Sequence, residues 1–429
     1  MATATATSYS AESGQTISGG RFAPLAVQQL AADAIWTFHT KPEAVSHEGY
    51  TYLGWCDSTG WSGVSRINEV TGATDRMALI NTGEVDDHNN CSIYIEGNEM
   101  VVFGNTHNTT TIRYRVLSDL ALFTSGAAWS ADTQVSSGLS YAYMNPMYLT
   151  KDPSKRYLWS RRWNAVGGAK RSLGWNTTAD MTAVPATYSA RVNVATNLDL
   201  DNAWPYWDVR SNGYDRVDVI INQVPQNVGQ SSVYHFYAKI DDSMVMRYYK
   251  TDGTEITASL PFNVEDECTL VYDGSTTRAW VSDVQMGSDG HPRLLWPRMP
   301  GNNGAAFEYY YSRWTGSAWV NTKICDGGQG FSGFPWWYHR AHCFDANDTD
   351  RVYVCRTASS VDYVEEYRTT DNGATWSLHR TIRDSSVAGT RAFARPISPR
   401  NHTGALSVIW HEGTFTDFND YDTNAYGAG

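Results

Sequence analysis

Short apolar runs recur along the chain, separated by glycine, asparagine and aspartate. Many of them alternate apolar and polar positions, which predicts β-strands, and no segment shows the 3.6-residue period of a long amphipathic helix. The runs form groups of three or four that repeat at intervals of roughly 45–60 residues, a period typical of propeller blades. The pattern therefore predicts an all-β fold, a seven-bladed β-propeller over residues 31–429 with six or eight blades as alternatives, after a polar lead-in over residues 1–30.

The clearest strand-like runs begin with residues 34–38 and 50–55 and continue through 111–116, 141–148, 156–163, 204–207, 216–221, 232–237, 279–281, 292–296, 307–313, 351–355 and 405–410. The octapeptide at 369–376 fits the Asp-box pattern, in which Asp371 caps a turn, Gly373 takes a positive φ and Trp376 packs between sheets. Such boxes mark propeller blades and do not catalyse. We expect the N-terminal segment to help the last group close the ring.

Two histidine-containing segments flank one predicted hairpin. Residues 86–90 (Asp-Asp-His-Asn-Asn) precede the hairpin over residues 92–103, and residues 104–108 (Gly-Asn-Thr-His-Asn) follow it. An antiparallel hairpin brings its two ends together, so we expect His88 and His107 to open into one cleft. Histidines that titrate near neutral pH suit acid–base or charge-stabilising work. The alternative is a pair of surface loop histidines that hydrogen-bond to their neighbours.

Composition narrows the classes of partner. The net charge of −12 argues against a nucleic-acid partner, because binding to phosphates needs clustered cations. Local arginines can still bind an anionic substrate against this overall sign. No apolar run approaches the length of a membrane span, so we expect no membrane partner.

A group of cysteines in the second half raises the question of a metal. Cys325, Cys343 and Cys355 lie near one another in the sequence, with His342 among them. Three thiolates and one imidazole would complete a closed structural zinc site. The spacing lacks a paired Cys-x-x-Cys, so ordinary buried cysteines are the alternative. No cofactor is expected for catalysis.

Several motifs occur in an order that resembles the BNR-repeat propeller family, which includes seven-bladed ulvan lyases and rhamnosyl-glucuronate lyases. They lie at residues 87–89, 143–146, 157–161, 205–206, 212–217, 233–237, 369–376 and 395–401. The resemblance implies a polysaccharide lyase that cleaves the rhamnose-(1→4)-glucuronate linkage of an ulvan-like acidic glycan by β-elimination, leaving an unsaturated uronate. We accordingly expect an extracellular or periplasmic monomer, although the first residues contain no signal peptide.

Carried over position by position, the resemblance places the catalytic residues at His88, His107, Tyr143 and Arg161. Arg161 would grip the substrate carboxylate with two hydrogen bonds while negative charge builds on it. His107 and Tyr143 would be the base and the acid, in either order, and His88 would orient or polarise the carboxylate. The resemblance and the local sequence add four expected substrate contacts: Asn89, Tyr206, His339 and Trp337.

Two departures from the family pattern leave the exact glycan open. Asp208 stands where relatives often have a basic residue, and residues 337–340 (Trp-Tyr-His-Arg) replace a common Tyr-Ser-Gly-Gly. Two other functions also stay open. A glycoside hydrolase on the same fold normally needs paired carboxylates, for which only Asp86 and Asp87 stand out. A non-catalytic glycan-binding propeller would need no catalytic groups at all.

Overall fold

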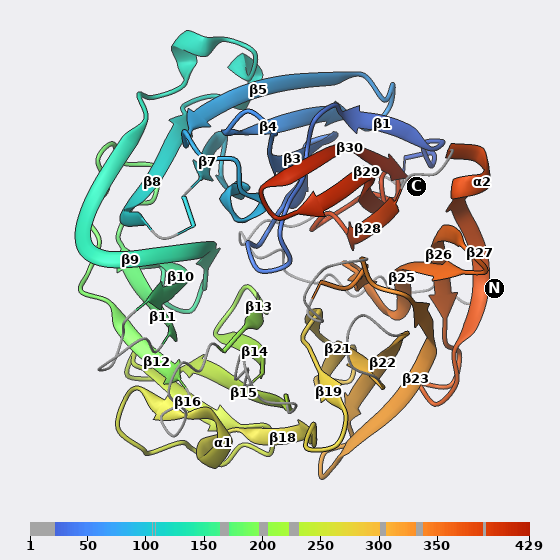
Figure 1. Cartoon of the computed structure of the whole chain (residues 1–429). Helices are drawn as coiled ribbons and strands as arrows, with labels where there is room; N and C mark the ends of the chain where they lie inside the picture. Colours follow the sequence, from blue (N-terminus) through green and yellow to red (C-terminus); the bar gives the residue numbers. More distant parts are fainter. Residues whose placement is uncertain are drawn as a thin grey trace, which may run out of the picture.

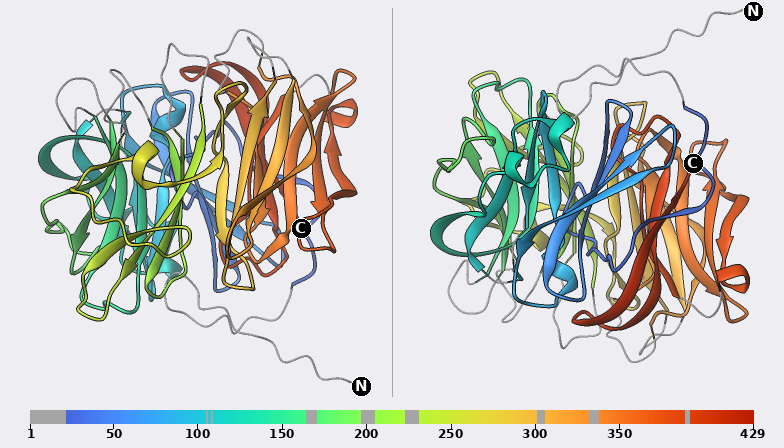
Figure 2. Two further views of the ribbon diagram at one scale, coloured as in Figure 1. Left: turned by 90° about the horizontal axis from the view of Figure 1, so that it is seen from below. Right: turned by 90° about the horizontal axis from the view of Figure 1, so that it is seen from above.

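The computed structural model describes residues 22–104, 106–107, 109–163, 171–196, 205–222, 231–300, 306–331, 338–388 and 392–429. Within these ranges the chain consists mainly of β-strands, whose sheets are arranged around a common centre (Figure 1). Views turned by 90° show the strands running across the thickness of the ring (Figure 2). The expected all-β propeller is confirmed. None of the described helices is long and apolar enough to cross a membrane.

The described strands form six sheets, three of which come from the chain between Ala44 and Tyr272. One sheet contains β2 (Ala44–His47), β3 (Tyr50–Cys56), β4 (Trp61–Asn68) and β5 (Thr74–Asn81), hydrogen-bonded in that order. The next contains, from one edge to the other, β6 (Ser92–Glu96), β7 (Glu99–Phe103), β8 (Thr109–Leu117), β9 (Thr133–Tyr148), β10 (Arg156–Trp163), β11 (Ser172–Thr178), β12 (Val192–Thr196) and β17 (Phe262–Asn263). A third contains β13 (Trp207–Ser211), β14 (Arg216–Asn222), β15 (Val233–Ile240) and β16 (Met246–Lys250), with β18 (Thr269–Tyr272) beside β15.

The chain from Arg278 onward, together with β1, forms the other three sheets. The first contains β19 (Arg278–Ala279), β21 (Pro292–Met299), β22 (Phe307–Trp314) and β23 (Trp319–Gly328), with β20 (Asp283–Met286) beside β21. The second contains β24 (His342–Asp345), β25 (Asp348–Ala358), β26 (Val361–Arg368) and β27 (Ser377–Asp384). The third contains β28 (Ala392–Ile397), β29 (Val408–Asp417), β30 (Asp420–Ala428) and β1 (Gln28–Ala31). Two short helices, α1 (Val264–Glu267) and α2 (Ser385–Ala388), and 3₁₀ turns at Asp87–Asn89, Leu120–Leu122 and Gly126–Ala128 lie between strands.

The N-terminal strand closes the ring, as expected from the sequence. β1 pairs antiparallel with β30, so the two ends of the chain share one sheet. β1 begins at Gln28, inside the segment predicted as a lead-in, and that segment therefore contributes to the propeller. Residues 34–38 do not form the predicted strand; Ile35 makes only an isolated bridge with Cys56. Of the run at 204–207, only Trp207 belongs to a strand, and Trp204 lies outside the described residues.

The first strands of the sheets face the axis of the ring. β13 contacts β20, β20 contacts β24, and β24 contacts β28. On the other side β2 contacts β6, and β6 contacts β9. A parallel bridge joins Val45 of β2 to Arg400, in the segment that follows β28. Side chains that are far apart in the sequence therefore meet near the centre, where a propeller has its channel.

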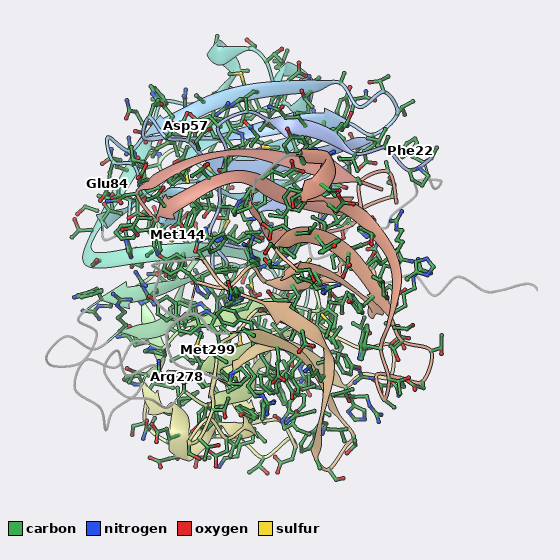
Figure 3. The ribbon with its side chains drawn as sticks, turned by 45° about the vertical axis from the view of Figure 1, so that its right-hand side comes forward. Phe22, Asp57, Glu84, Met144, Arg278 and Met299 are labelled. Atoms are coloured by element: carbon green, nitrogen blue, oxygen red, sulfur yellow. The ribbon has the colours of Figure 1, made fainter. Side chains whose placement is uncertain are left out.

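Apolar side chains fill the space between neighbouring sheets (Figure 3). The Asp-box at 369–376 contributes to this packing in the way predicted. The Asp371 carboxylate accepts a hydrogen bond from the Thr375 backbone N–H at 2.8 Å, and Gly373 has φ +83°. The Trp376 ring packs edge-on against Tyr311 of the neighbouring sheet, with 5.1 Å between centroids.

Candidate active site

The 3₁₀ turn Asp87–Asn89 holds His88 near the axis. Asp86 caps this turn, and its carboxylate accepts the His88 backbone N–H at 2.8 Å. The turn is fixed from behind by Ser62 of β4, whose hydroxyl donates to the Asn89 carbonyl oxygen at 2.6 Å. Asp86, Asp87 and Asn89 are all buried. A short polar segment thus becomes a rigid support for one imidazole.

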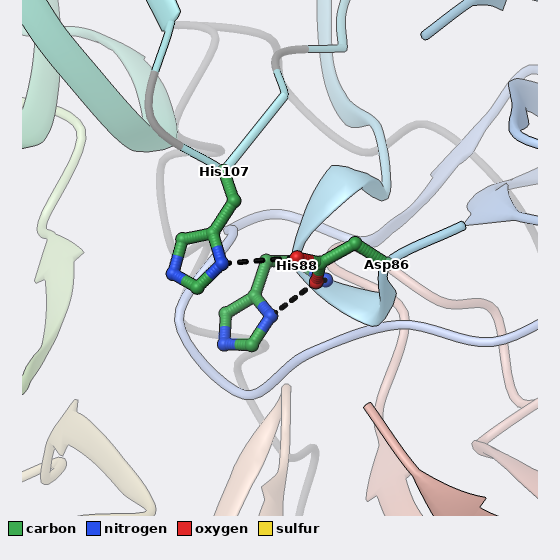
Figure 4. A group of neighbouring side chains, drawn as sticks. All are labelled: Asp86, His88 and His107. Carbon is green, nitrogen blue, oxygen red and sulfur yellow. Dashed lines mark hydrogen bonds and ion pairs between the residues drawn. The ribbon is translucent and has the colours of Figure 1, made fainter. Parts of the chain in front are cut away.

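The β6–β7 hairpin brings the second imidazole to the first, as the sequence predicted. The carboxylate of Asp86 accepts hydrogen bonds from Nδ1 of both His88 and His107, the latter at 3.0 Å (Figure 4). The two rings lie parallel, with 3.9 Å between centroids and 12° between planes. A carboxylate can only accept these bonds, so both Nδ1 atoms carry protons and the Nε2 atoms point away from Asp86.

The two histidines differ in protonation because their surroundings shift their pKa values in opposite directions. Burial disfavours charge on His88, but the Asp86 and Asp87 carboxylates outweigh it and raise the pKa of His88 to about 10. Burial and the positive charge of His88 lower the pKa of His107 to about 3, although Asp86 opposes this shift. At neutral pH His88 is therefore a cation and His107 a free base. The His107 Nε2 atom is buried and has no hydrogen-bond partner among the described residues.

Tyr143 and Arg161 lie beside the histidine pair. The Tyr143 ring stacks near His88 at 5.8 Å between centroids, and Arg161 donates from Nη1 to the Tyr143 hydroxyl at 3.2 Å. Tyr143 has φ +58° and sits at a register shift between β9 and β10. A non-glycine residue in this strained conformation at a bulge re-aims its side chain, a device common next to active sites.

The environment of Tyr143 keeps its hydroxyl protonated. Burial raises the pKa of Tyr143 well above its usual value, and the charge of Arg161 only partly offsets this. The Asn145 side chain stabilises the bulge, because its amide donates to the Tyr143 carbonyl at 2.7 Å and its oxygen accepts the Lys41 backbone N–H at 2.8 Å. Arg161 is 1% exposed, and its Nη2 atom has no partner among the described side chains and backbone groups.

Tyr206 extends the cluster, and sequence reasoning missed its partner Arg171. Tyr206 lies 6.2 Å from Tyr143 between ring centroids, and its hydroxyl accepts from Arg171 Nη1 at 3.1 Å. Burial would raise the pKa of Tyr206, but the charges of Arg171 and Arg161 lower it to about 8. The two tyrosines of the cluster therefore differ in acidity. Nothing in the sequence around Arg171 marks this contact across strands.

His39 is a second residue that the sequence did not indicate. Its ring packs 5.2 Å from Tyr143 and 4.9 Å from Tyr206, and its Nδ1 donates to the Trp207 carbonyl at 2.9 Å. Burial lowers the pKa of His39 well below its usual value, so this ring is neutral. It lies in the loop after residues 34–38, and only the closed ring brings that loop beneath the tyrosines.

The remaining expected substrate contacts are Asn89, His339 and Trp337, and the structure describes the first two. Asn89 is buried, and its amide donates to the Glu84 carbonyl at 3.2 Å, so it supports the turn. His339 is fully buried and stacks on Phe38 at 4.8 Å between centroids. Burial lowers the pKa of His339 well below its usual value. Neither side chain is placed at an accessible surface of the cluster. Trp337 lies outside the described residues.

The four predicted zinc ligands are not assembled into one group. In the described part of the chain, the group of three metal-type ligands whose atoms all lie within 4.8 Å of one another is Asp86, His88 and His107, and these are already joined by hydrogen bonds. Cys325 lies on β23, in a different sheet from Cys343 and Cys355. His342 stacks on Tyr309 at 4.4 Å between centroids and donates from Nε2 to the Tyr310 carbonyl. Zinc binding stays a prediction for elemental analysis.

Comparisons with known proteins show which family and fold the chain shares. Residues 50–326 match the BNR repeat-containing family, and no curated protein matches the chain by sequence. The fold is similar to that of a polysaccharide lyase, a PL25 ulvan lyase bound to -[GlcA(1-4)Rha3S]-, with a TM-score of 0.70 and 13% identity over 94% of this chain and 95% of that chain. A further PL25 ulvan lyase structure gives a TM-score of 0.69 at 13% identity, over 96% of each chain. At this identity the likeness shows the shared fold.

Proposed function

The chain belongs to the family of BNR repeat-containing proteins, and from this premise we propose that it is a polysaccharide lyase acting on an acidic glycan. The finer proposal is cleavage of a rhamnose-(1→4)-glucuronate linkage by β-elimination. The observation that carries it is the pairing of a neutral imidazole with a cationic one on a single carboxylate, beside a buried arginine and a protonated tyrosine.

The positive charges of Arg161 and His88 would stabilise the negative charge that develops when the C5 proton is removed. The C5 proton of a uronate is barely acidic while the neighbouring carboxylate keeps its full charge, and removing that proton places further charge there. Arg161 and protonated His88 supply two positive charges within one contiguous cluster. Fixed charges of this kind stabilise the developing dianion more than the ground state, because they need no reorganisation as the charge builds.

The protonation states suggest which residue is the base and which the acid. Neutral His107 takes the C5 proton at Nε2, because its Nδ1 is already protonated and donates a hydrogen bond to Asp86. The electron pair of the C–H bond forms the C4=C5 double bond, and the C4–O4 bond breaks. Tyr143 donates its hydroxyl proton to the departing O4 oxygen. At neutral pH His107 is unprotonated at Nε2 and the Tyr143 hydroxyl keeps its proton, so each group is in the protonation state that its proton transfer requires.

The vacant hydrogen-bonding positions agree with this assignment. Buried polar atoms in folded proteins nearly always have partners, and exceptions need an explanation. His107 Nε2 and Arg161 Nη2 lack partners among the described residues. In the proposed reaction His107 Nε2 faces the C5 proton, and Arg161 Nη2 binds the substrate carboxylate.

Asp86 does not supply the proton donor that the hydrolase alternative requires. Asp86 and Asp87 are both ion-paired with His88. Burial would raise the pKa of Asp86, but the charge of His88 and hydrogen bonds from both rings hold it well below its usual range, so it cannot serve as a proton donor. A hydrolase needs one carboxylic acid that stays protonated.

We also infer a seven-bladed count for the ring. The first part of β9 pairs with β8, and residues from Ser140 onward pair with β10. The eight-stranded sheet therefore divides at β9 into a four-stranded blade (β6 to β9) and a five-stranded one (β9 to β12 with β17), which share the long strand β9. Together with the five other sheets this gives seven. An extracellular or periplasmic monomer remains part of the proposal.

Mass spectrometry of the products tests the reaction class. The protein is incubated with a rhamnose–glucuronate glycan, and the masses of the released oligosaccharides are measured. Elimination gives a uronate lighter by one water than the product of hydrolysis. His107→Ala is the inactive comparison, and His379→Ala, an exposed histidine on β27, is its matched control. Saturated ends would assign a hydrolase, and an unchanged glycan would leave only binding.

A further inference from the structure

Arg395 lies on β28 in the sheet that closes the ring. It has φ +52°, and it falls at a register shift between Ala394 and Ile397. Its side chain is 2% exposed. An arginine in the left-handed region is strained, so the surrounding structure must hold it there. Tyr143 shows the same combination of a positive φ and a register shift, on the strand that carries it into the cluster.

The strained position aims a guanidinium at Asp87. Arg395 Nη1 lies 2.7 Å from Asp87 Oδ2, and the same nitrogen donates to the Trp36 carbonyl at 2.5 Å. The guanidinium carbon lies 4.8 Å from the Phe38 ring centroid and 5.0 Å from that of Phe415. Aromatic rings therefore pack around a charge that is directed at one carboxylate.

Asp87 connects this arginine to His88. Its other oxygen, Oδ1, lies 2.8 Å from His88 Nδ1. The charges alternate along a buried chain: Arg395 positive, Asp87 negative, His88 positive and Asp86 negative, with neutral His107 at the end. Without Arg395, His88 would face two carboxylates alone, and the group would carry one net negative charge toward a carboxylate substrate.

We propose that Arg395 is a positioning residue that neutralises Asp87, so that the positive charge of His88 is available to the substrate carboxylate. This inference rests on the proposed function for the identity of the substrate group. The chain of ion pairs itself does not depend on it. Arg395 acts through Asp87, with which its guanidinium is ion-paired, and Asp87 in turn pairs with His88.

A double-mutant cycle separates this role from simple fold stabilisation. Arg395→Met removes the charge and should lower kcat/KM roughly 10- to 100-fold, the range expected for coupled groups in one network. Asp87→Asn combined with Arg395→Met removes both charges, so activity should recover toward that of Asp87→Asn alone. Arg395→Lys keeps the charge and should lose less. A purely structural arginine predicts that the double variant is as poor as, or poorer than, Arg395→Met.

A readout without turnover keeps the two proposals distinguishable. The histidine ring signals of wild type and variants are titrated by NMR. His88 is faced by the carboxylates of Asp86 and Asp87 and by the rings of His107 and Tyr143. Arg395→Met should shift the His88 and His107 titrations to higher pH, and the added Asp87→Asn should reverse the shift. Unchanged titrations in Arg395→Met would overturn the inference even if the protein is a lyase. Wild-type protein without lyase activity would instead overturn only the proposed function.

Folding failure of one variant does not remove the test. If Arg395→Met does not fold, the double variant is compared with Asp87→Asn alone. Because Arg395 acts through Asp87, both proteins should give the same histidine titrations and the same kcat/KM. A clear difference between them would overturn the inference.

Discussion

The ring of His107 lies flat on the ring of His88, with 3.9 Å between their centroids. Two imidazoles at this distance cannot both be charged without strong repulsion, and the Asp86 carboxylate beneath them favours one proton on the pair beyond the two Nδ1 protons. The geometry therefore gives the two rings different roles: His88 carries the positive charge, and His107 keeps an unprotonated Nε2. Loss of either role should have its own effect on turnover and on its dependence on pH.

Removing the proposed base should abolish most turnover. His107→Ala is expected to lower kcat about 10²- to 10⁴-fold, the usual contribution of a positioned acid or base. Binding should change less, because His107 is neutral. Steady-state kinetics compare it with His379→Ala, which replaces an exposed histidine and should keep wild-type rates. Equal activity in the two variants would exclude His107 as the base.

Replacing Arg161 by lysine should separate charge from geometry. Arg161→Lys keeps a cation but loses the planar fork that grips a carboxylate, so kcat should fall about 10²- to 10³-fold, or roughly 3–4 kcal/mol. The matched change is Arg247→Lys on β16, a half-exposed arginine that pairs with Asp241. Both variants should melt like the wild type. Full activity in Arg161→Lys would remove its assigned role.

Activity should decline in two steps as pH rises. The pKa of Tyr206 is lowered to about 8 despite burial, by Arg171 and Arg161. Above that pH its phenolate would neutralise these arginines and repel the substrate carboxylate. The second step comes near the pKa of His88, about 10, where the cation is lost. A pH profile of kcat/KM for Tyr206→Phe should lack the first step and keep the second. An unaltered profile would contradict this assignment.

Asp86 should make the protein sensitive to acid. Burial opposes its charge, yet His88 and the bonds from both rings hold the folded-state pKa of Asp86 below its ordinary value. A depressed carboxyl pKa contributes stability that is fully present above the unfolded-state value of about 4, and that stability is lost progressively as pH falls from there toward the lower folded-state pKa. Between about pH 6 and pH 3 the Tm of Asp86→Asn should therefore fall less than that of wild type. Asp422→Asn, at an exposed aspartate, should follow the wild type.

The Asp-box glycine should be intolerant of a side chain for two reasons that can be separated. A Cβ at Gly373 would lie 2.0 Å from a carbon of the Tyr311 ring, at φ +83°. Gly97 also has a positive φ, +61°, but a Cβ there would meet nothing within 4 Å. Gly97→Ala should cost about 1–2 kcal/mol for the backbone alone. Gly373→Ala should cost a further 1–3 kcal/mol or so for overpacking, measured by denaturant unfolding. Equal costs would contradict the packing role.

The sequence predicted what local patterns determine. Strand runs such as those at β14 and β15, the β6–β7 hairpin and the Asp-box depend on alternation and turn residues, and these were found where expected. The sequence did not predict side-chain contacts between residues from different sheets of the ring. His39, Arg171 and Arg395 reach the cluster only because the first strands converge on the axis, which no local pattern reveals. The run at 34–38 is apolar because it is buried beside the axis, not because it pairs in a sheet.

The zinc prediction also depended on proximity in the sequence, which does not determine proximity in the fold. Proximity in sequence suggested one site for Cys325, Cys343 and Cys355. In the fold, Cys343 lies opposite Tyr353, which places Cys355 beyond it along β25, and Cys325 belongs to the preceding sheet. Elemental analysis of purified protein would find about one zinc per chain if these residues bind it, and metal-free protein with unchanged melting would favour three ordinary cysteines.

The most direct test of the proposed lyase reaction is the ultraviolet absorbance of the conjugated double bond during digestion of a rhamnose–glucuronate glycan. Wild-type protein should produce this absorbance steadily, His379→Ala should match it, and His107→Ala and Arg161→Lys should nearly abolish it while remaining folded. Folded wild-type protein that gives no unsaturated product from any uronate glycan would contradict the proposed reaction.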